Sequence, residues 1–288
     1  MGRRIVIMSN CQTGGLYAAL GGMLPDDEHL PIAWLGTEPE GLRDLLSIAD
    51  VFVSSLPRAE SEALLAAAGS RARLIPVPVI WFPGFHPDII HVPSPEGGEL
   101  ASAVGPYNSM ITLWGWRNGW SAEAIIEAFT PATFAGLGYP AHWTGMVNNL
   151  RTVFETAEMD FASWFLPLAR GSAFMLTDNH PRLDALVQMA RLVALDLGAD
   201  PALVRYRWEQ AIADGLLATS VVWPIYPGIA EGLGLPGAYV WRAADGELMG
   251  LEPFVRRSLA AYEGIDPRSL TIARFDHDQR FAAVLGGS

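Results

Sequence analysis

The chain has 288 residues, half of them apolar, and a formal net charge of −12. All 19 basic residues are arginine, which excludes a Schiff-base lysine and the lysine of a phosphate-binding loop. The single cysteine excludes an intramolecular disulfide and a multi-cysteine zinc or iron–sulfur site. The acidic balance argues against nucleic-acid binding, because that function needs a basic surface.

No basic, apolar, small-residue leader is recognisable at the start of the sequence. No apolar run reaches the ~20 residues that a membrane-spanning helix needs. We therefore expect a soluble, cytoplasmic protein without an integral membrane segment. The apolar content is sufficient for a sizeable core.

The first stretch, residues 4–20, predicts a strand, a tight polar turn and a helix. Residues 5–8 form a short apolar run typical of a buried strand, and Gly14 and Gly15 precede residues that favour a helix. Cys11 falls in the turn, where a helix start favours the thiolate, so we expect an accessible thiol with a lowered pKa. An inert buried cysteine is the alternative. The position favours the reactive role, because the carboxyl end of a first strand faces the ligand crevice.

Strands and helices alternate through residue 82, which predicts a parallel sheet with helices on both faces. Further strands are expected at residues 31–35, 50–55, 73–76, 79–82 and 172–177. Helices are expected at residues 38–48, 60–68, 121–129, 141–168, 182–197, 201–215 and 252–262. A Pro- and Gly-rich segment, residues 82–105, interrupts the alternation.

We expect a single domain over residues 1–288. Its α/β core would comprise residues 1–105 and 170–200, with a helical insertion at about 106–170. Residues 201–288 would form a mainly helical and irregular C-terminal part, so that the C-terminal half as a whole is rich in helix.

Three polar clusters lie near the ends of predicted strands or between prolines. They are Ser9-Asn10-Cys11-Gln12, Phe85-His86-Pro87-Asp88 and Thr177-Asp178-Asn179-His180-Pro181. The first and third follow predicted strands and precede helices, which would place them on one edge of a parallel sheet. A thiol, an imidazole and a carboxylate at that edge would be a nucleophile, a base and an orienting group. Each cluster also has a structural interpretation, as a helix cap or a braced turn.

These clusters, together with Gly105-Pro-Tyr-Asn-Ser-Met-Ile111, occur in the same order in one known family. The sequence resembles the WcbI-type capsular polysaccharide biosynthesis family over about residues 3–200. The resemblance implies a coenzyme-A-binding acetyltransferase that modifies a bacterial surface polysaccharide. It also implies acetyl-CoA as cosubstrate, a saccharide acceptor, and an α/β core similar to SGNH esterases and flavodoxin-like sheets.

By this resemblance, Cys11 stands where SGNH esterases carry their nucleophilic serine, and Asp178 and His180 stand for their late Asp-x-x-His motif. The motif here is one residue shorter, so Asp88 is an alternative partner for the imidazole. We expect His180 to be the general base and His86 to position substrate or cofactor; in an alternative mechanism, either histidine deprotonates the sugar hydroxyl directly. The other expected binding residues are Ser9, Asn10, Gln12, Gly14, Gly15, Asp88, Tyr107, Ser109 and Asn179. The arginines considered for the CoA phosphates are Arg58, Arg117 and Arg151.

Three functions therefore stay open. The leading hypothesis is an O-acetyltransferase that uses acetyl-CoA, the second an SGNH-type esterase acting on an acylated glycan, and the third a non-catalytic nucleotide- or glycan-binding module. CoA binding separates the first from the second, and the loss of Cys11 and His180 tests the third. The motif His86-x-Asp88-x-x-His91 could bind a divalent ion, but a turn braced by proline is the better interpretation, so no metal is expected.

Overall fold

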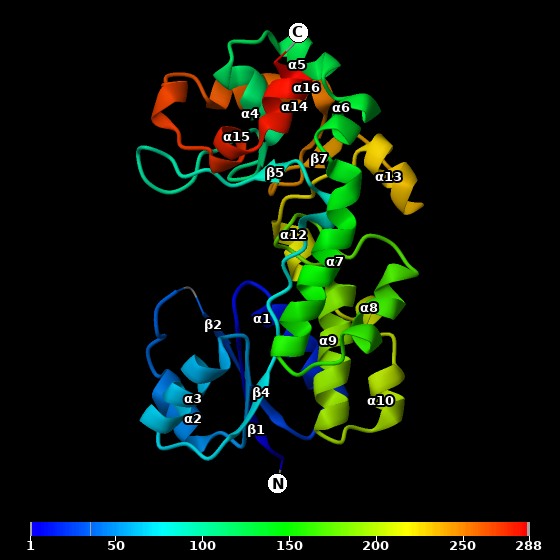
Figure 1. The fold of residues 1–288 in the computed structure, drawn as a ribbon. Helices are drawn as coiled ribbons and strands as arrows, with labels where there is room; N and C mark the ends of the chain where they lie inside the picture. Colours follow the sequence, from blue (N-terminus) through cyan, green and yellow to red (C-terminus); the bar gives the residue numbers. More distant parts are fainter. Residues whose placement is uncertain (1, 35, 287–288) are drawn as a thin grey trace. The chain divides into compact units, whose positions relative to one another are not determined.

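The computed structural model describes residues 2–34 and 36–286 and divides the chain into two compact units (Figure 1). The first unit comprises Met1–Trp81, Asn148–Met175 and Asn179–Ala218. The second comprises Phe82–Val147, Leu176–Asp178 and Thr219–Ser288. Both the expected core and the expected helical insertion are thus divided between the two units.

The first unit contains a parallel sheet of four strands in the order β2-β1-β3-β4. The strands are β1 (Arg4–Ser9), β2 (Glu28–Ala33), β3 (Val51–Ser54) and β4 (Arg73–Pro76). Ile7 of β1 lies opposite Pro31 of β2 on one side and Val53 of β3 on the other. Pro31 is tolerated because β2 is an edge strand of this sheet. The α/β class and the parallel sheet predicted from the sequence are confirmed.

Helices cover both faces of this sheet (Figure 1). The helices α1 (Thr13–Met23) and α9 (Leu183–Asp196) pack together on one face, and α2 (Leu42–Ile48) and α3 (Arg58–Ala67) pack on the other. Since both faces are covered, the central strand β1 is apolar along residues 5–8, and all four side chains are fully buried. The core under α2 and α3 consists of Val6, Met8, Leu42, Leu46, Phe52 and Leu65.

The order of the strands fixes where the first unit can bind a ligand. From β1 the chain passes to β2 on one side and then crosses to β3 on the other. In open α/β sheets, ligands bind outside the carboxyl ends of the strands at such a reversal. The turn that carries Cys11 follows the carboxyl end of β1 directly.

The other helices of the first unit are short except α8. They are α8 (Phe161–Ala169), α10 (Pro201–Arg205), α11 (Trp208–Ala211) and α12 (Gly215–Thr219), whose last residue belongs to the second unit. The helix α7 (Tyr139–Thr156) begins in the second unit and ends in the first.

The second unit is mainly helical. Its helices are α4 (Met110–Arg117), α5 (Ala122–Glu127), α6 (Pro131–Gly136), α13 (Pro227–Leu233), α14 (Leu251–Ala261), α15 (Ala273–His277) and α16 (Gln279–Leu285), with 3-10 turns at Pro83–Phe85 and Pro267–Ser269. Two short antiparallel pairs complete it, β5 (Ile89–Ile90) with β6 (Asn108–Ser109) and β7 (Val240–Arg242) with β8 (Leu248–Gly250). In the part of the chain that is described, none of the helices is both long and apolar enough to cross a membrane.

Four predicted elements differ from the structure. Residues 172–177 and 79–82 are not strands of the sheet. In the first of these segments, Phe174 is buried with its ring 5.5 Å from that of Trp164, so its apolar side chain serves helix packing instead of a sheet face. The helix predicted at residues 201–215 is interrupted at Tyr206, where the backbone is extended. The second strand begins earlier than predicted, and Leu35, at its predicted end, lies outside the described residues.

Candidate functional site

A compact hydrogen-bonded turn holds Cys11 beyond the end of β1. The backbone N–H of Ser9 donates to Thr13 Oγ1 at 3.0 Å, and that hydroxyl donates to the Ser9 carbonyl at 2.7 Å. The backbone N–H of Gln12 donates to Asn10 Oδ1 at 3.1 Å. Asparagine and threonine commonly stabilise turns through such local bonds. The roles of Ser9 and Asn10 seen here are therefore to shape the turn.

Gln12 connects this turn to the chain beyond β4. Its side chain is fully buried, and Nε2 donates to the carbonyl of Ile80 at 2.9 Å while the Ile80 N–H donates to Oε1 at 3.1 Å. Both ends of the amide are thus used within the first unit. This pairing fixes the position of the residue next to Cys11, which is what a reactive turn requires.

Cys11 is exposed to solvent, as the sequence predicts. Its surroundings nevertheless desolvate the charged form, and burial raises the pKa of the thiol above its ordinary value. The expected lowering of the pKa is wrong. The helix α1 begins at Thr13, so Cys11 precedes the first helical turn, and its own backbone N–H offsets the desolvation only in part. A thiol in this state needs a base before it can act as a nucleophile.

The two glycines after the turn have different structural roles. A Cβ atom added to Gly15 would lie 2.4 Å from Leu186 Cδ1, so a larger residue there would force the Leu186 side chain of α9 to shift. A Cβ atom on Gly14 would meet no atom within 4 Å, and Gly14 is exposed. Together with Cys11 they border a hollow of about 370 Å³ in the first unit.

His86 is almost fully buried in the second unit. Burial lowers its pKa from 6.5 to about 4, although the charge of Asp178 and the backbone groups of Thr177 and Trp223 act in the opposite direction. The ring is therefore neutral at physiological pH. Its Nδ1 atom is buried and has no hydrogen-bond partner within the described residues. A neutral, enclosed imidazole suits the positioning role that we predict for His86 better than the role of a base.

Asp88 is completely buried and surrounded by hydrogen-bond donors. The hydroxyl of Tyr139 donates to Oδ1 at 2.7 Å, the hydroxyl of Tyr226 donates to Oδ2 at 2.8 Å, and the Ile111 N–H donates to Oδ1 at 3.1 Å. Burial outweighs these donors and the Ser109 hydroxyl, so the pKa of Asp88 rises to about 6. From its position just before β5, the carboxyl group thus binds the first turns of α4 and α7 and the N-cap residue of α13, and none of these three donors is His86.

The paired imidazole of the second unit is His91. Its Nε2 lies 3.1 Å from Asp178 Oδ2, and its Nδ1 lies 3.6 Å from Glu99 Oε2. The hydrogen bond to Asp178 is the largest cause of the raised pKa of His91. The Asp178 side chain is 4% exposed, whereas that of His91 is 29% exposed. A buried carboxylate that orients a partly exposed imidazole is the arrangement of a base in acyl transfer.

Sequence reasoning missed this pair because its members are 87 residues apart in the chain. His91 does occur in the His86-x-Asp88-x-x-His91 pattern, but that spacing predicts a turn or a metal site. The sequence signal that could have found it is the apolar pair Ile89-Ile90 directly before His91, which forms β5 in the structure. Among the described residues, no group of three or more His, Cys, Asp and Glu side chains could hold a metal ion.

The predicted binding residues Tyr107, just before β6, and Ser109, on β6, support this region. The ring of Tyr107 lies 5.2 Å from that of His91, with an angle of 67° between the ring planes. Ser109 is the N-cap of α4 and accepts from the Thr112 N–H at 3.1 Å. Both residues are buried, so their observed contacts are with the protein, and Tyr107 packs directly on the paired imidazole.

The remaining predicted residues lie where the chain passes between units. Asp178 belongs to the second unit, while Asn179, His180 and Cys11 belong to the first. Asn179 and His180 are half-buried. The joint site of Cys11, His180 and Asp178 stays a prediction, and within the second unit the carboxylate of Asp178 is already bonded to His91.

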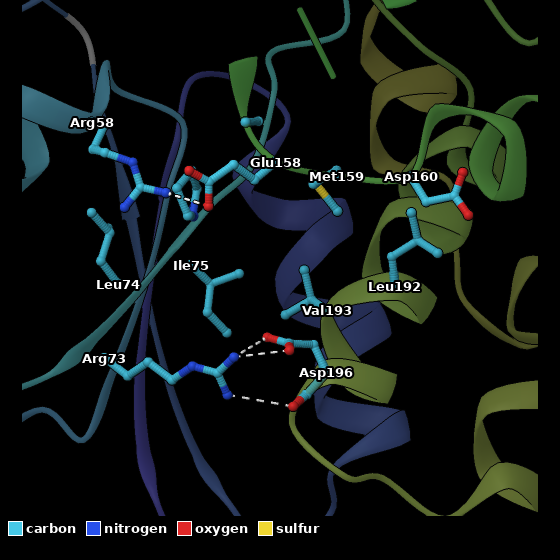
Figure 2. A pocket seen from close by; sticks show the side chains of 12 residues that line it. Arg58, Arg73, Leu74, Ile75, Glu158, Met159, Asp160, Leu192, Val193 and Asp196 are labelled. Atoms are coloured by element: carbon cyan, nitrogen blue, oxygen red, sulfur yellow. Dashed lines mark hydrogen bonds and ion pairs between the residues drawn. The ribbon is translucent and has the colours of Figure 1, made fainter. Parts of the chain in front are cut away.

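The predicted phosphate-binding arginines are engaged within the protein. Arg58 pairs with Glu158 at 2.8 Å and Arg73 pairs with Asp196 at 2.6 Å, both at the edge of a hollow of about 400 Å³. Figure 2 shows these two pairs on either side of the hollow. The guanidinium of Arg151 lies 5.5 Å from the centre of the Phe161 ring. The third predicted arginine, Arg117, pairs with Asp276 at 3.4 Å. Both guanidinium groups at the hollow in Figure 2 are thus paired with carboxylates, and Asp160 adds a further negative charge to the lining.

The sheet order and the exposed thiol define an open α/β protein. Its candidate site lies at the carboxyl ends of β1 and β3, between which the strand order reverses. Residues 4–202 match the model of the family described as polysaccharide biosynthesis enzyme WcbI, and the chain belongs to this family. Among curated proteins, none matches the sequence.

A solved structure with 15% sequence identity aligns with a TM-score of 0.76 and covers 99% of this chain and 99% of that chain. That structure is described as WcbI, a novel polysaccharide biosynthesis enzyme, in the native form without a disulfide bond between coenzyme A and one of its cysteines. At this identity the likeness shows that the two proteins share their fold.

Proposed function

We propose that this protein is a CoA-binding O-acyltransferase, in its simplest form an acetyltransferase, that modifies a saccharide of a capsular or other surface polysaccharide. The observation that carries the proposal is the exposed Cys11, held by a hydrogen-bonded turn at the carboxyl end of β1 in the four-stranded parallel sheet. Membership of a polysaccharide biosynthesis family supports the substrate class. The description of the similar structure, which names coenzyme A together with a cysteine of that protein, supports the donor.

In the proposed reaction, Cys11 Sγ attacks the thioester carbonyl of acyl-CoA. The bond between the acyl carbon and the CoA sulfur breaks, the acyl carbon becomes bonded to Cys11, and the proton of the thiol passes through a base to the leaving CoA thiolate. The sugar hydroxyl then attacks the new thioester, gives its proton to the base and returns Cys11 as a free thiol. Because one thioester replaces another, the first step is nearly balanced in energy.

The base is needed because burial raises the pKa of the Cys11 thiol. We propose His180 for this role, with Asp178 as its orienting carboxylate. Within the second unit Asp178 is bonded to His91, so a His91→Asn variant tests whether this carboxylate acts through His91 instead. We propose that His86, whose ring is buried and neutral, positions the substrate.

The experiment measures CoA binding by native mass spectrometry and acyl transfer to an acceptor saccharide by product release. Cys11→Ala should retain CoA binding and lose turnover. Replacing the true base by Asn should lower kcat by ~10²–10⁴-fold with little change in KM. His180→Asn and His91→Asn are compared, and the exposed His277→Asn is the matched control.

Each result assigns a role. A loss confined to His91→Asn would overturn His180 as the base and leave the transferase standing. Failure of the wild-type protein to bind CoA, with release of acyl groups from glycans into water, would replace the transferase by an esterase. Full activity of Cys11→Ala would exclude the covalent pathway.

A further inference from the structure

The hollow beside Cys11 differs in character from the one in Figure 2. It has a volume of about 370 Å³ and lies between the start of α1, the start of α9 and residues 212–216. Its walls carry the apolar side chains of Ala18, Leu186, Ile212 and Leu216. Of the described residues that line it, none is basic. The hollow therefore offers no basic side chain to a phosphate group, and its mainly apolar lining suits an uncharged, apolar ligand.

The one charged residue in the wall is already used by the protein. Asp214 Oδ1 accepts from the Leu217 N–H at 2.8 Å, and Oδ2 accepts from the Leu183 N–H at 3.2 Å. The carboxylate thereby holds the 212–216 segment against the start of α9. Its role is to maintain the wall of the hollow, and the apolar character of the lining is unchanged.

The size of the hollow exceeds what an acetyl group needs. A water molecule takes up about 30 Å³ of liquid volume, and an acetyl group has only three non-hydrogen atoms. The hollow, at about 370 Å³, falls within the range of about 300–1,000 Å³ that small-molecule sites occupy. An occupant that matches both the volume and the lining is a hydrocarbon chain of several carbons.

We propose that this hollow is an acyl-chain site, which binds the tail of a thioester whose carbonyl carbon is transferred from CoA to Cys11 Sγ, and that the preferred acyl group is longer than acetyl. The inference rests on the proposed function. Cys11 borders the hollow, so a chain attached to its sulfur can enter the apolar space directly. The same water-poor surroundings that raise the pKa of this thiol also favour the binding of an apolar chain.

The experiment measures the dissociation constants of CoA and of acetyl-, butyryl-, hexanoyl- and octanoyl-CoA by calorimetry with the full-length protein. Each methylene that enters the hollow should tighten binding about fourfold, which corresponds to ~0.8 kcal/mol. Ala18→Leu narrows the hollow and should abolish this gain for hexanoyl- and octanoyl-CoA while leaving CoA unchanged. Ile212→Ala widens the hollow and should move the optimum to a longer chain. The same Ala→Leu change at the exposed Ala63 of α3 is the matched control.

The outcomes separate this inference from the proposed function. If CoA binds and its affinity does not rise with chain length, the acyl-chain site is refuted and the transferase stands. If Ala18→Leu weakens CoA and every acyl-CoA equally, the hollow holds the pantetheine arm and the proposal is overturned. If neither CoA nor any acyl-CoA binds, the proposed function itself fails.

Discussion

Replacing His86 or Asp88 should change the pH dependence of stability in opposite directions. Burial lowers the pKa of His86 from 6.5 to about 4, so its contribution to stability is complete above pH 6.5 and is lost as the pH falls toward 4. Burial raises the pKa of Asp88 from 3.8 to about 6, so its contribution is complete below pH 3.8 and is lost as the pH rises toward 6. The two windows overlap.

The magnitudes follow from these values. One pKa unit corresponds to about 1.4 kcal/mol, so each group should change the free energy of unfolding by about 3 kcal/mol across its window. In the wild-type protein the two contributions nearly cancel between about pH 4 and pH 6. Removing one group reveals the pH-dependent contribution of the other, because His86 binds a proton on unfolding and Asp88 releases one.

The assay is urea unfolding, followed by tryptophan fluorescence, at a series of pH values between 4 and 7 for wild type, His86→Asn and Asp88→Asn. Relative to wild type, the stability of His86→Asn should fall by about 3 kcal/mol as the pH rises from 4 to 6.5. That of Asp88→Asn should rise by about 3 kcal/mol from pH 4 to pH 6, on top of a constant loss from its missing hydrogen bond. The exposed His277→Asn is the control. Parallel curves for all four proteins would refute the reasoning.

Two further predictions concern the turn that carries the thiol. Gln12→Leu leaves the buried N–H and carbonyl of Ile80 without partners and should lower the free energy of unfolding by about 2–4 kcal/mol in chemical unfolding. The exposed Gln279→Leu is the control and should cost less than about 0.5 kcal/mol. Equal costs for the two variants would contradict the assigned role of Gln12. At neutral pH, iodoacetamide should alkylate Cys11 more slowly than a free cysteine peptide, and the alkylation rate should still increase above about pH 8.5. A rate that levels off below pH 8 would show that burial does not control the pKa of this thiol.

The sequence by itself predicts the α/β class, the parallel sheet and the position of Cys11 after the first strand. These predictions succeed because they depend on local composition. A strand buried on both faces must be continuously apolar, as residues 5–8 are, and a turn before a helix needs residues such as Asn10 that bond to nearby backbone. The ordered motifs likewise identify the family, since they require no knowledge of contacts.

The tertiary structure alone decides which charged and polar groups meet. The carboxylate of Asp178 bonds to His91, 87 residues away, and no local pattern contains that contact. The same holds for the pKa of Cys11, because the helix start that argues for a thiolate is visible in the sequence whereas the desolvation that outweighs it is not. Burial depends on every segment that packs around a group, and that sum exists only once the chain has folded.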